Sequence, residues 1–158
     1  MKWSQVLEDP TLQNLPYKIE LNEWGNIVLS PASNKHGLLQ AEISWFLRQN
    51  KKNGKALTEC SINTSKGVKV ADAAWGADDF FNRNYLETPY QEAPDLCIEI
   101  ISPSNAAQEI AEKINLYLSK GAKEVWVCNE EGFIKFYTSR GEIEASQLFP
   151  NAPKKIEY

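Results

Sequence analysis

The sequence predicts a single domain of mixed α/β class, spanning residues 1–158 and beginning with a short helical lead-in at residues 1–16. An apolar run at residues 96–101 is nearly continuous, as in a strand that is covered on both faces. An amphipathic stretch at 105–118 and a second apolar run at 124–128 follow it. Strand, helix and strand at this spacing predict a right-handed crossover between parallel strands.

Local patterns predict the elements of the N-terminal half. Residues 17–29 form two short strands around a turn at 22–25, and residues 38–49 carry apolar side chains at the spacing of one helical face. Segments 56–63 and 68–75 have the composition of an antiparallel pair joined by a polar turn. This half therefore supplies two hairpins and one helix.

Helix and turn signals organise the C-terminal half. A short helical turn is expected at residues 79–82. Asn105, with Gln108 three positions later, resembles a capping box, and Gly121 is a typical residue to terminate the helix that follows. Residues 133–138 come after a polar turn and are expected to pair antiparallel with the preceding strand.

The composition excludes several classes of protein. No apolar run is long enough to cross a membrane and the first residues do not resemble a signal peptide, so we expect a cytoplasmic protein. Cys60, Cys97 and Cys128 lack metal-type spacing and are expected to be reduced core residues. A net charge of −4 argues against general affinity for nucleic acid, and it leaves a local basic groove open.

Two carboxylates interrupt apolar strands, Asp72 in the segment 68–75 and Glu99 in the run 96–101. A buried carboxylate is costly unless it is paired, hydrogen-bonded or bound to a metal. Carboxylate oxygens suit Mg²⁺, and a nearby lysine would hold a phosphate or assist the attacking water, as in metal-assisted phosphodiester hydrolysis. A single histidine and the lack of nucleophile-elbow and P-loop motifs disfavour the main competing chemistries. Structural carboxylate networks remain an alternative.

Three further polar residues have open interpretations. Glu42 falls inside the apolar arc of the helix at 38–49, so it either reaches solvent at the edge of the stripe or points into a polar pocket. His36, just before that helix, is interpreted as a hydrogen-bonding or capping residue. Lys113 lies beside Tyr117 on the flank of the second helix, as either a surface lysine or a functional one.

Several linked motifs resemble a known family. The run PDLCIEIISPS at 94–104 is followed by EKINLY at 112–117, by Gly121 and by EVWVC at 124–128. Earlier stretches fit the same pattern: KIELNEWGNIV at 18–28, SPASN at 30–34 and the His36-Gly37 pair. Together they resemble the Uma-type putative restriction endonuclease family, which is assigned to the PD-(D/E)XK nuclease superfamily. The similarity extends from about residue 16 to residue 138.

The resemblance implies a restriction-endonuclease-like core, a central mixed sheet flanked by helices, with a metal site where two strands separate. Asp72 and Glu99 match the acidic residues of the two half-motifs, and the backbone carbonyl of Ile100 would join them as a metal ligand. Glu42 would correspond to a further acidic ligand from the first helix. Lys113 matches the catalytic lysine, which this family takes from the helix after the strand.

The chain departs from the superfamily pattern at two positions. Ile101 stands where a lysine is expected two residues after the acid, so activity depends on Lys113 reaching back to the site. Ala71 replaces a proline before Asp72, which alters a backbone restraint and removes no chemical group. Asp95 repeats in the family's strand motif with a capping or pairing role.

The function implied is a Mg²⁺-dependent endonuclease, with Mn²⁺ as an alternative metal, acting on nucleic acid and first of all on DNA. Cutting both strands favours a homodimer. Two other interpretations stay open. In one, the chain is a catalytically silent binding or assembly module, in which Glu99 and Lys113 form a buried ion pair. In the other, it is a phosphohydrolase of small nucleotides, which suits the acidic net charge better.

Overall fold

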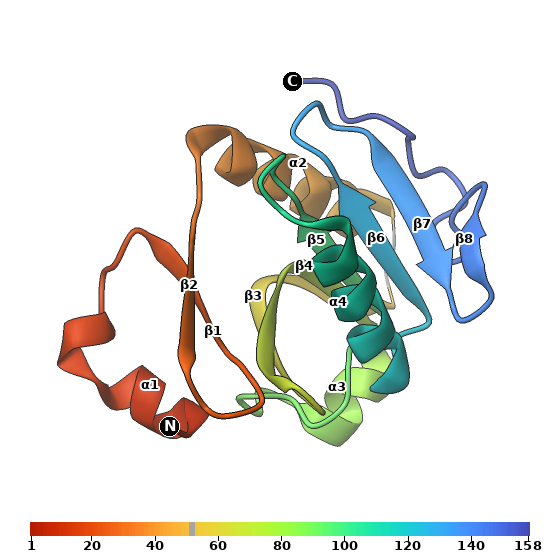
Figure 1. The fold of residues 1–158 in the computed structure, drawn as a ribbon. Coiled ribbons are helices and arrows are strands. Elements are labelled where there is room, and N and C mark those ends of the chain that lie inside the picture. The colour runs from red at the N-terminus through yellow and green to blue at the C-terminus, as the bar shows by residue number, and fades with distance from the viewer. Residues whose placement is uncertain (51–52) are drawn as a thin grey trace.

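The computed structural model describes residues 1–50 and 53–158, and its centre is a six-stranded mixed sheet (Figure 1). Its strands, in spatial order, are β3 (Gly54–Thr64), β4 (Gly67–Ala77), β5 (Leu96–Ile100), β6 (Glu124–Cys128), β7 (Ile134–Thr138) and β8 (Gly141–Ile143). Only β5 and β6 pair in parallel; the other neighbours are antiparallel. The predicted crossover and the mixed sheet are confirmed.

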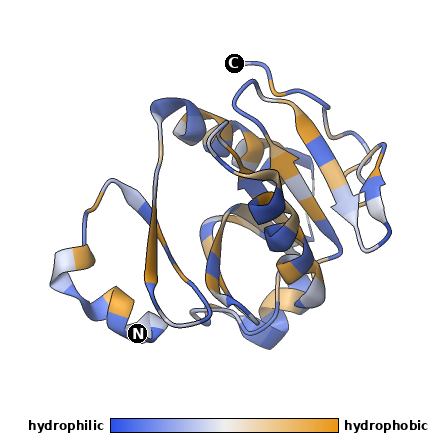
Figure 2. Cartoon of the chain, viewed as in Figure 1, coloured by the Kyte–Doolittle hydropathy of each residue, from blue (hydrophilic) through white to orange (hydrophobic). Residues whose placement is uncertain are grey.

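Helices cover both faces of this sheet. On one face, α2 (Asn34–Asn50) packs Leu39, Ile43 and Leu47 into a core with the large aromatic residues of β4 and β6. On the other face, α4 (Ala107–Ser119) contributes Ile114 and Tyr117 to a second core, which α3 (Asp78–Asn84) also joins. The two cores explain why β5 and β6 are apolar on both sides, and Figure 2 shows hydrophobic residues along the central strands.

The N-terminal segment forms a separate layer beside β4. It consists of α1 (Trp3–Glu8), the 3₁₀ helix η1 (Pro10–Leu12) and a hairpin of β1 (Tyr17–Leu21) with β2 (Ile27–Pro31). Among the described residues, this hairpin forms no backbone ladder with the main sheet. Trp3, Val6 and Leu21 pack instead against Val68 and Val70 of β4, and this contact fixes where the polar face of β1 lies.

The structure corrects two helix starts. The helix α2 begins at Asn34 rather than near residue 38, because the Ser33 hydroxyl accepts the His36 N–H at 3.1 Å and caps a first turn that lacks apolar spacing. His36 is therefore a helical residue and not a loop residue. The expected capping box on α4 is wrong: Asn105 Oδ1 accepts the Ser102 N–H at 2.9 Å and stabilises the preceding loop instead.

The remaining elements agree with the sequence predictions apart from their ends. The predicted hairpins and the helical turn correspond to β1–β2, β3–β4 and α3, and β2 continues to Pro31, beyond the predicted end of that strand at residue 29. The short strand β8 was not predicted. Among the described residues, no helix combines the length and the apolar character that crossing a membrane requires.

Candidate active site

The site is built around Asp72, which lies at a break in the sheet. The β4–β5 ladder ends at the pair Ala73↔Ile98, next to Asp72. The β3–β4 register also passes over Asp72, at the level of Glu59, whose φ of 52° is left-handed. The backbone oxygen of Asp72 instead accepts Gln40 Nε2 from α2 at 2.7 Å. A helical side chain thus replaces a strand partner, and β4 and β5 separate at Asp72.

The Asp72 carboxylate is fully buried and is contacted from three directions. Its Oδ2 accepts the backbone N–H of Ile100 at 2.7 Å. Its Oδ1 lies 3.0 Å from Lys18 Nζ and 3.2 Å from His36 Nε2. Burial alone would raise the pKa of Asp72. The His36 hydrogen bond, the Lys18 charge and the Ile100 N–H outweigh it and lower that pKa to about 2. Asp72 is therefore ionised at neutral pH.

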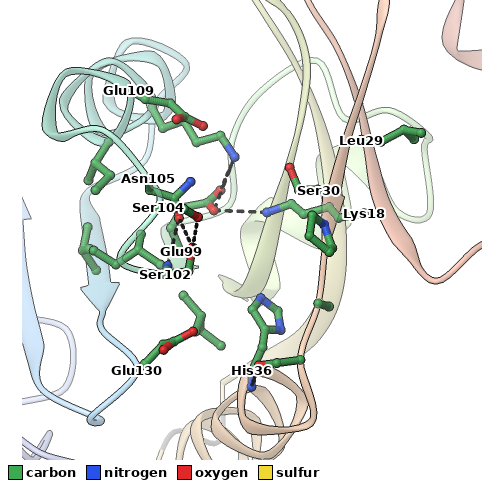
Figure 3. A pocket seen from close by; sticks show the side chains of 18 of the residues that line it. Lys18, Leu29, Ser30, His36, Glu99, Ser102, Ser104, Asn105, Glu109 and Glu130 are labelled. Carbon is green, nitrogen blue, oxygen red and sulfur yellow. Dashed lines mark hydrogen bonds and ion pairs between the residues drawn. The ribbon is translucent and has the colours of Figure 1, made fainter.

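The Glu99 carboxylate extends from β5 toward the same point. Tyr117 of α4 donates its hydroxyl to Glu99 Oε1 at 2.5 Å, and Lys18 Nζ lies 3.1 Å from Glu99 Oε2. Figure 3 shows Lys18 pointing at Glu99 across the cavity. Burial raises the pKa of Glu99, against the opposing effect of the Lys113 and Lys18 charges. Asp72 and Glu99 thus share one cation, the ammonium of Lys18.

Lys113 reaches the cluster from α4. Its Nζ lies 3.4 Å from Glu99 Oε1 and 2.9 Å from Glu20 Oε1, so the predicted lysine contacts the predicted acid. Glu20, on β1, also accepts the Val70 N–H at 2.7 Å, which anchors it against β4. Three buried carboxylates are therefore balanced by two lysines and by His36.

Sequence reasoning missed Lys18 and Glu20. The sequence does carry a signal for them. Lys18 and Glu20 are both charged, and they share a face of the strand 17–21 because they are two residues apart. That signal predicts a polar face on β1. It does not say that this face covers the break between β4 and β5, because only the packing of Leu21 against Val68 and Val70 decides that.

Two predicted residues lie away from the cluster. Glu42 is exposed on α2 and does not line the cavity at the site, so its proposed role as a ligand stays a prediction that this geometry does not favour. Asp95 lies at the other end of β5, where its Oδ2 accepts the Ala77 N–H at 2.7 Å and its Oδ1 lies 3.2 Å from Lys123 Nζ. These contacts fit the expected capping and pairing role.

A cavity of about 470 Å³ opens directly onto Lys18, His36, Glu99 and Lys113. Its walls include the end of β2 with the residues after it, the loop that precedes α4 and the first turns of α4, and Figure 3 labels Ser30, Ser102, Ser104 and Asn105 among them. Glu109 and Glu130 add negative charge to the lining. A polar ligand can therefore reach the buried cluster from one side, past hydroxyl and amide groups.

The side chains of the site fit a hard divalent cation only if that cation takes few of its ligands from the protein. In the part of the chain that the structure describes, no group of three or more His, Cys, Asp and Glu side chains is arranged to hold a metal ion. Mg²⁺, however, commonly uses one or two protein carboxylates and takes its other ligands from water and substrate phosphate. Asp72 Oδ1 and Glu99 Oε2 meet that requirement, since they already converge on one cation.

Comparison with known proteins identifies the family. Residues 3–153 match the Uma2 family, described as "Putative restriction endonuclease". The chain belongs to the Uma2 family. No curated protein sequence matches it significantly. A crystal structure of a putative nuclease belonging to DUF820, from Anabaena variabilis, is similar in fold: the TM-score is 0.69 at 21% sequence identity, over 90% of this chain and 82% of that one.

Membership of the Uma2 family confirms the resemblance seen in the sequence. The structural likeness confirms the fold, which in this chain is a six-stranded mixed sheet flanked by helices. The family description makes nucleic acid the coarse substrate class. Restriction-endonuclease-like families typically use divalent metals, so the family also makes a divalent metal the expected kind of cofactor.

Proposed function

We propose that this Uma2 protein is a Mg²⁺-dependent endonuclease that hydrolyses phosphodiester bonds in DNA, with Asp72, Glu99 and Lys113 as its catalytic residues. One observation carries the proposal: two buried carboxylates from adjacent strands aim one oxygen each at a single cation, at the inner end of an open polar cavity. In the absence of metal that cation is the ammonium of Lys18. Mn²⁺ would serve in place of Mg²⁺, since both prefer oxygen ligands.

Each residue has a defined task in this mechanism. Asp72 and Glu99 would hold the metal, with the Ile100 carbonyl as a further ligand. A bound divalent metal supplies Lewis acidity to the phosphate and lowers the pKa of a bound water. Lys113, which Glu20 holds at 2.9 Å, would orient the attacking water beside Glu99 and neutralise charge on the phosphate. Tyr117 fixes the Glu99 carboxylate through its hydroxyl.

The proposal is tested by cleavage of supercoiled plasmid in Mg²⁺ or Mn²⁺. We expect Asp72→Asn, Glu99→Gln and Lys113→Gln each to reduce cleavage at least about a hundredfold, because each removes a metal ligand or the catalytic lysine. Circular dichroism checks that the variants stay folded. Glu87→Gln is the carboxylate control at an exposed position outside the cavity lining and should retain activity. Full activity in a clean preparation of Asp72→Asn or Glu99→Gln would remove that residue from the mechanism.

One observation favours the rival interpretation, a catalytically silent module. The carboxylates already have lysine partners, and the Glu99–Lys113 ion pair that this interpretation requires is present at 3.4 Å. Calorimetric titration of the metal-free protein with Mn²⁺ separates the two functions. Binding that Asp72→Asn abolishes supports the nuclease, whereas no binding up to millimolar Mn²⁺ supports the module.

The acidic lining of the cavity bears on the substrate. Glu109 and Glu130 face the same space as the cluster, and their charge opposes phosphate binding, so this observation favours the alternative of a small-nucleotide substrate over a long duplex. Plasmid, single-stranded DNA, RNA and dinucleotides should be compared as substrates under identical metal conditions. Cleavage confined to dinucleotides would replace the endonuclease by the small-nucleotide phosphohydrolase.

A further inference from the structure

The two carboxylates at the centre of the site each have one oxygen bound to the scaffold. Asp72 Oδ2 accepts the Ile100 N–H at 2.7 Å, and Glu99 Oε1 accepts the Tyr117 hydroxyl at 2.5 Å. The other oxygens, Asp72 Oδ1 and Glu99 Oε2, lie 3.0 and 3.1 Å from Lys18 Nζ. Lys18 therefore stands at the point on which the two remaining oxygens converge.

A divalent metal cannot share that point with an ammonium. Mg²⁺ binds oxygen at about 2.0–2.1 Å, so an ion held by both oxygens would take the place of Lys18 Nζ. Two cations within a few ångströms of each other in a buried site repel strongly. Moving the metal to the opposite oxygens would break the bonds from the Ile100 backbone and from Tyr117. The least costly arrangement is therefore exchange of one cation for the other.

Lys18 is placed so that it can leave. It lies on β1, whose hairpin makes no backbone ladder with the main sheet, so rotation of its side chain breaks no strand pairing. The side chain is 11% exposed and lines the cavity, as Figure 3 shows. Its long aliphatic stem can stay packed while the ammonium turns into the cavity. Lys113 differs from Lys18 in having a carboxylate partner outside the proposed metal ligands, because Glu20 lies 2.9 Å from its ammonium.

We propose that Lys18 is the exchangeable cation of this site: its ammonium pairs with both Asp72 and Glu99 in the metal-free protein, and a divalent metal displaces it into the cavity. The inference rests on the proposed metal-dependent function and adds a residue that controls metal affinity. The apparent association constant for the metal equals the intrinsic constant multiplied by the fraction of molecules in which Lys18 has already left, so a small fraction means weak apparent binding. Lys18 thus offsets part of the negative charge of the empty site, and it weakens metal binding.

The test is calorimetric titration of the metal-free full chain with Mn²⁺, comparing the unmodified protein with Lys18→Met. Methionine keeps an unbranched apolar side chain and removes the charge. We expect Lys18→Met to bind Mn²⁺ at least about tenfold more tightly, because no ammonium has to be displaced. Lys66→Met, at an exposed lysine paired with Glu112, is the matched control and should leave the affinity unchanged. Asp72→Asn should abolish the binding heat, which locates it at this site.

Two results would overturn the proposal, and they have different meanings. If the unmodified chain binds Mn²⁺ through Asp72 and Lys18→Met binds it no more tightly, exchange is refuted and the metal site stands. If none of the variants binds Mn²⁺, the proposed metal-dependent function fails together with the exchange.

A second measurement uses the unmodified protein and does not depend on the folding of a variant. A lysine-selective acylating reagent is applied with and without Mg²⁺, and modification of each lysine is read by mass spectrometry. The paired amine of Lys18 should become several-fold more reactive when Mg²⁺ displaces it, while Lys66 keeps its reactivity. Unchanged labelling of Lys18 at a Mg²⁺ concentration shown to saturate the site would refute displacement.

Discussion

At the scale of single residues, burial of charge is what organises the site. Asp72 and Glu99 are removed from water almost completely, and an unpaired charge there would cost several kcal/mol. The chain compensates with two lysines, a tyrosine hydroxyl and one backbone N–H. The pKa values of the two carboxyl groups shift in opposite directions: that of Asp72 falls to about 2, whereas burial raises that of Glu99.

The pKa of His36 reports this electrostatic environment directly. The hydrogen bond to Asp72 raises the pKa of His36 above its ordinary value of 6.5; partial burial opposes the rise and the Asp72 charge adds to it. Because the folded pKa is raised, the stabilisation from protonated His36 is fully present below pH 6.5 and is lost as the pH rises through the folded value.

This expectation is checked by proton NMR. The chain has a single histidine, so one imidazole signal reports the titration without ambiguity. We expect a midpoint above 6.5 in the unmodified protein and a lower midpoint in Asp72→Asn, which removes the charged partner. A midpoint at or below 6.5 in the unmodified protein would contradict the contact between His36 and Asp72.

At the scale of secondary-structure elements, strand ends and helix starts decide where the functional groups lie. The early start of α2 brings His36 onto the helix one turn before Gln40, and both side chains contact Asp72 where β4 separates from β5. The same strand system is anchored at the beginning of β6 by Glu124. This carboxylate accepts Trp126 Nε1, the Ser146 hydroxyl and the backbone N–H groups of Gln147 and Leu148.

Glu124 should be a stability residue and not a catalytic one. Glu124→Gln replaces one carboxylate oxygen by an NH₂ group that faces existing donors, so we expect a loss of about 3 kcal/mol in the free energy of unfolding. Urea unfolding followed by circular dichroism measures it. Glu131→Gln, at an exposed position, is the matched control and should be within about 0.5 kcal/mol of the unmodified protein. Equal stability of the two variants would show that the Glu124 hydrogen bonds contribute nothing net.

At the scale of the whole molecule, the site exists only because three layers meet. The main sheet supplies Asp72 and Glu99, the covering helix α4 supplies Lys113, and the N-terminal hairpin supplies Lys18 and Glu20. The hairpin is held to β4 by the apolar contact of Trp3, Val6 and Leu21 with Val68 and Val70. Loss of that contact would separate the lysine from both carboxylates.

The oligomeric state should be visible in the products of plasmid cleavage. One active site cuts one strand, so a monomer would accumulate nicked circles before linear plasmid, whereas a symmetric dimer would cut both strands together. We predict a homodimer, and so early linear product and a sedimentation mass close to twice 17.9 kDa. A monomer mass together with nicked circles alone would contradict the dimer.

The sequence by itself determined the elements whose signals are local. Apolar runs and helical spacing predicted the crossover of β5, α4 and β6, and the motifs around Glu99 and Lys113 identified the family. The start of α2 was not predicted correctly, because the Ser33 hydroxyl caps a first turn that carries no apolar pattern. A similar local pattern at Asn105 predicted a cap that does not form, because the side chain bonds into its own loop.

Only the tertiary structure decided how the site is completed. Lys18 is separated from Asp72 by 54 positions and from Glu99 by 81, and their contact depends on the docking of β1 over the gap beside β4. Likewise Gln40, and not Glu42, reaches Asp72 from α2. Residues two positions apart in an α-helix point to nearly opposite sides, so Glu42 lies on the exposed face. Local patterns specify which side chains are charged, whereas packing between distant segments specifies which charges share a point in space.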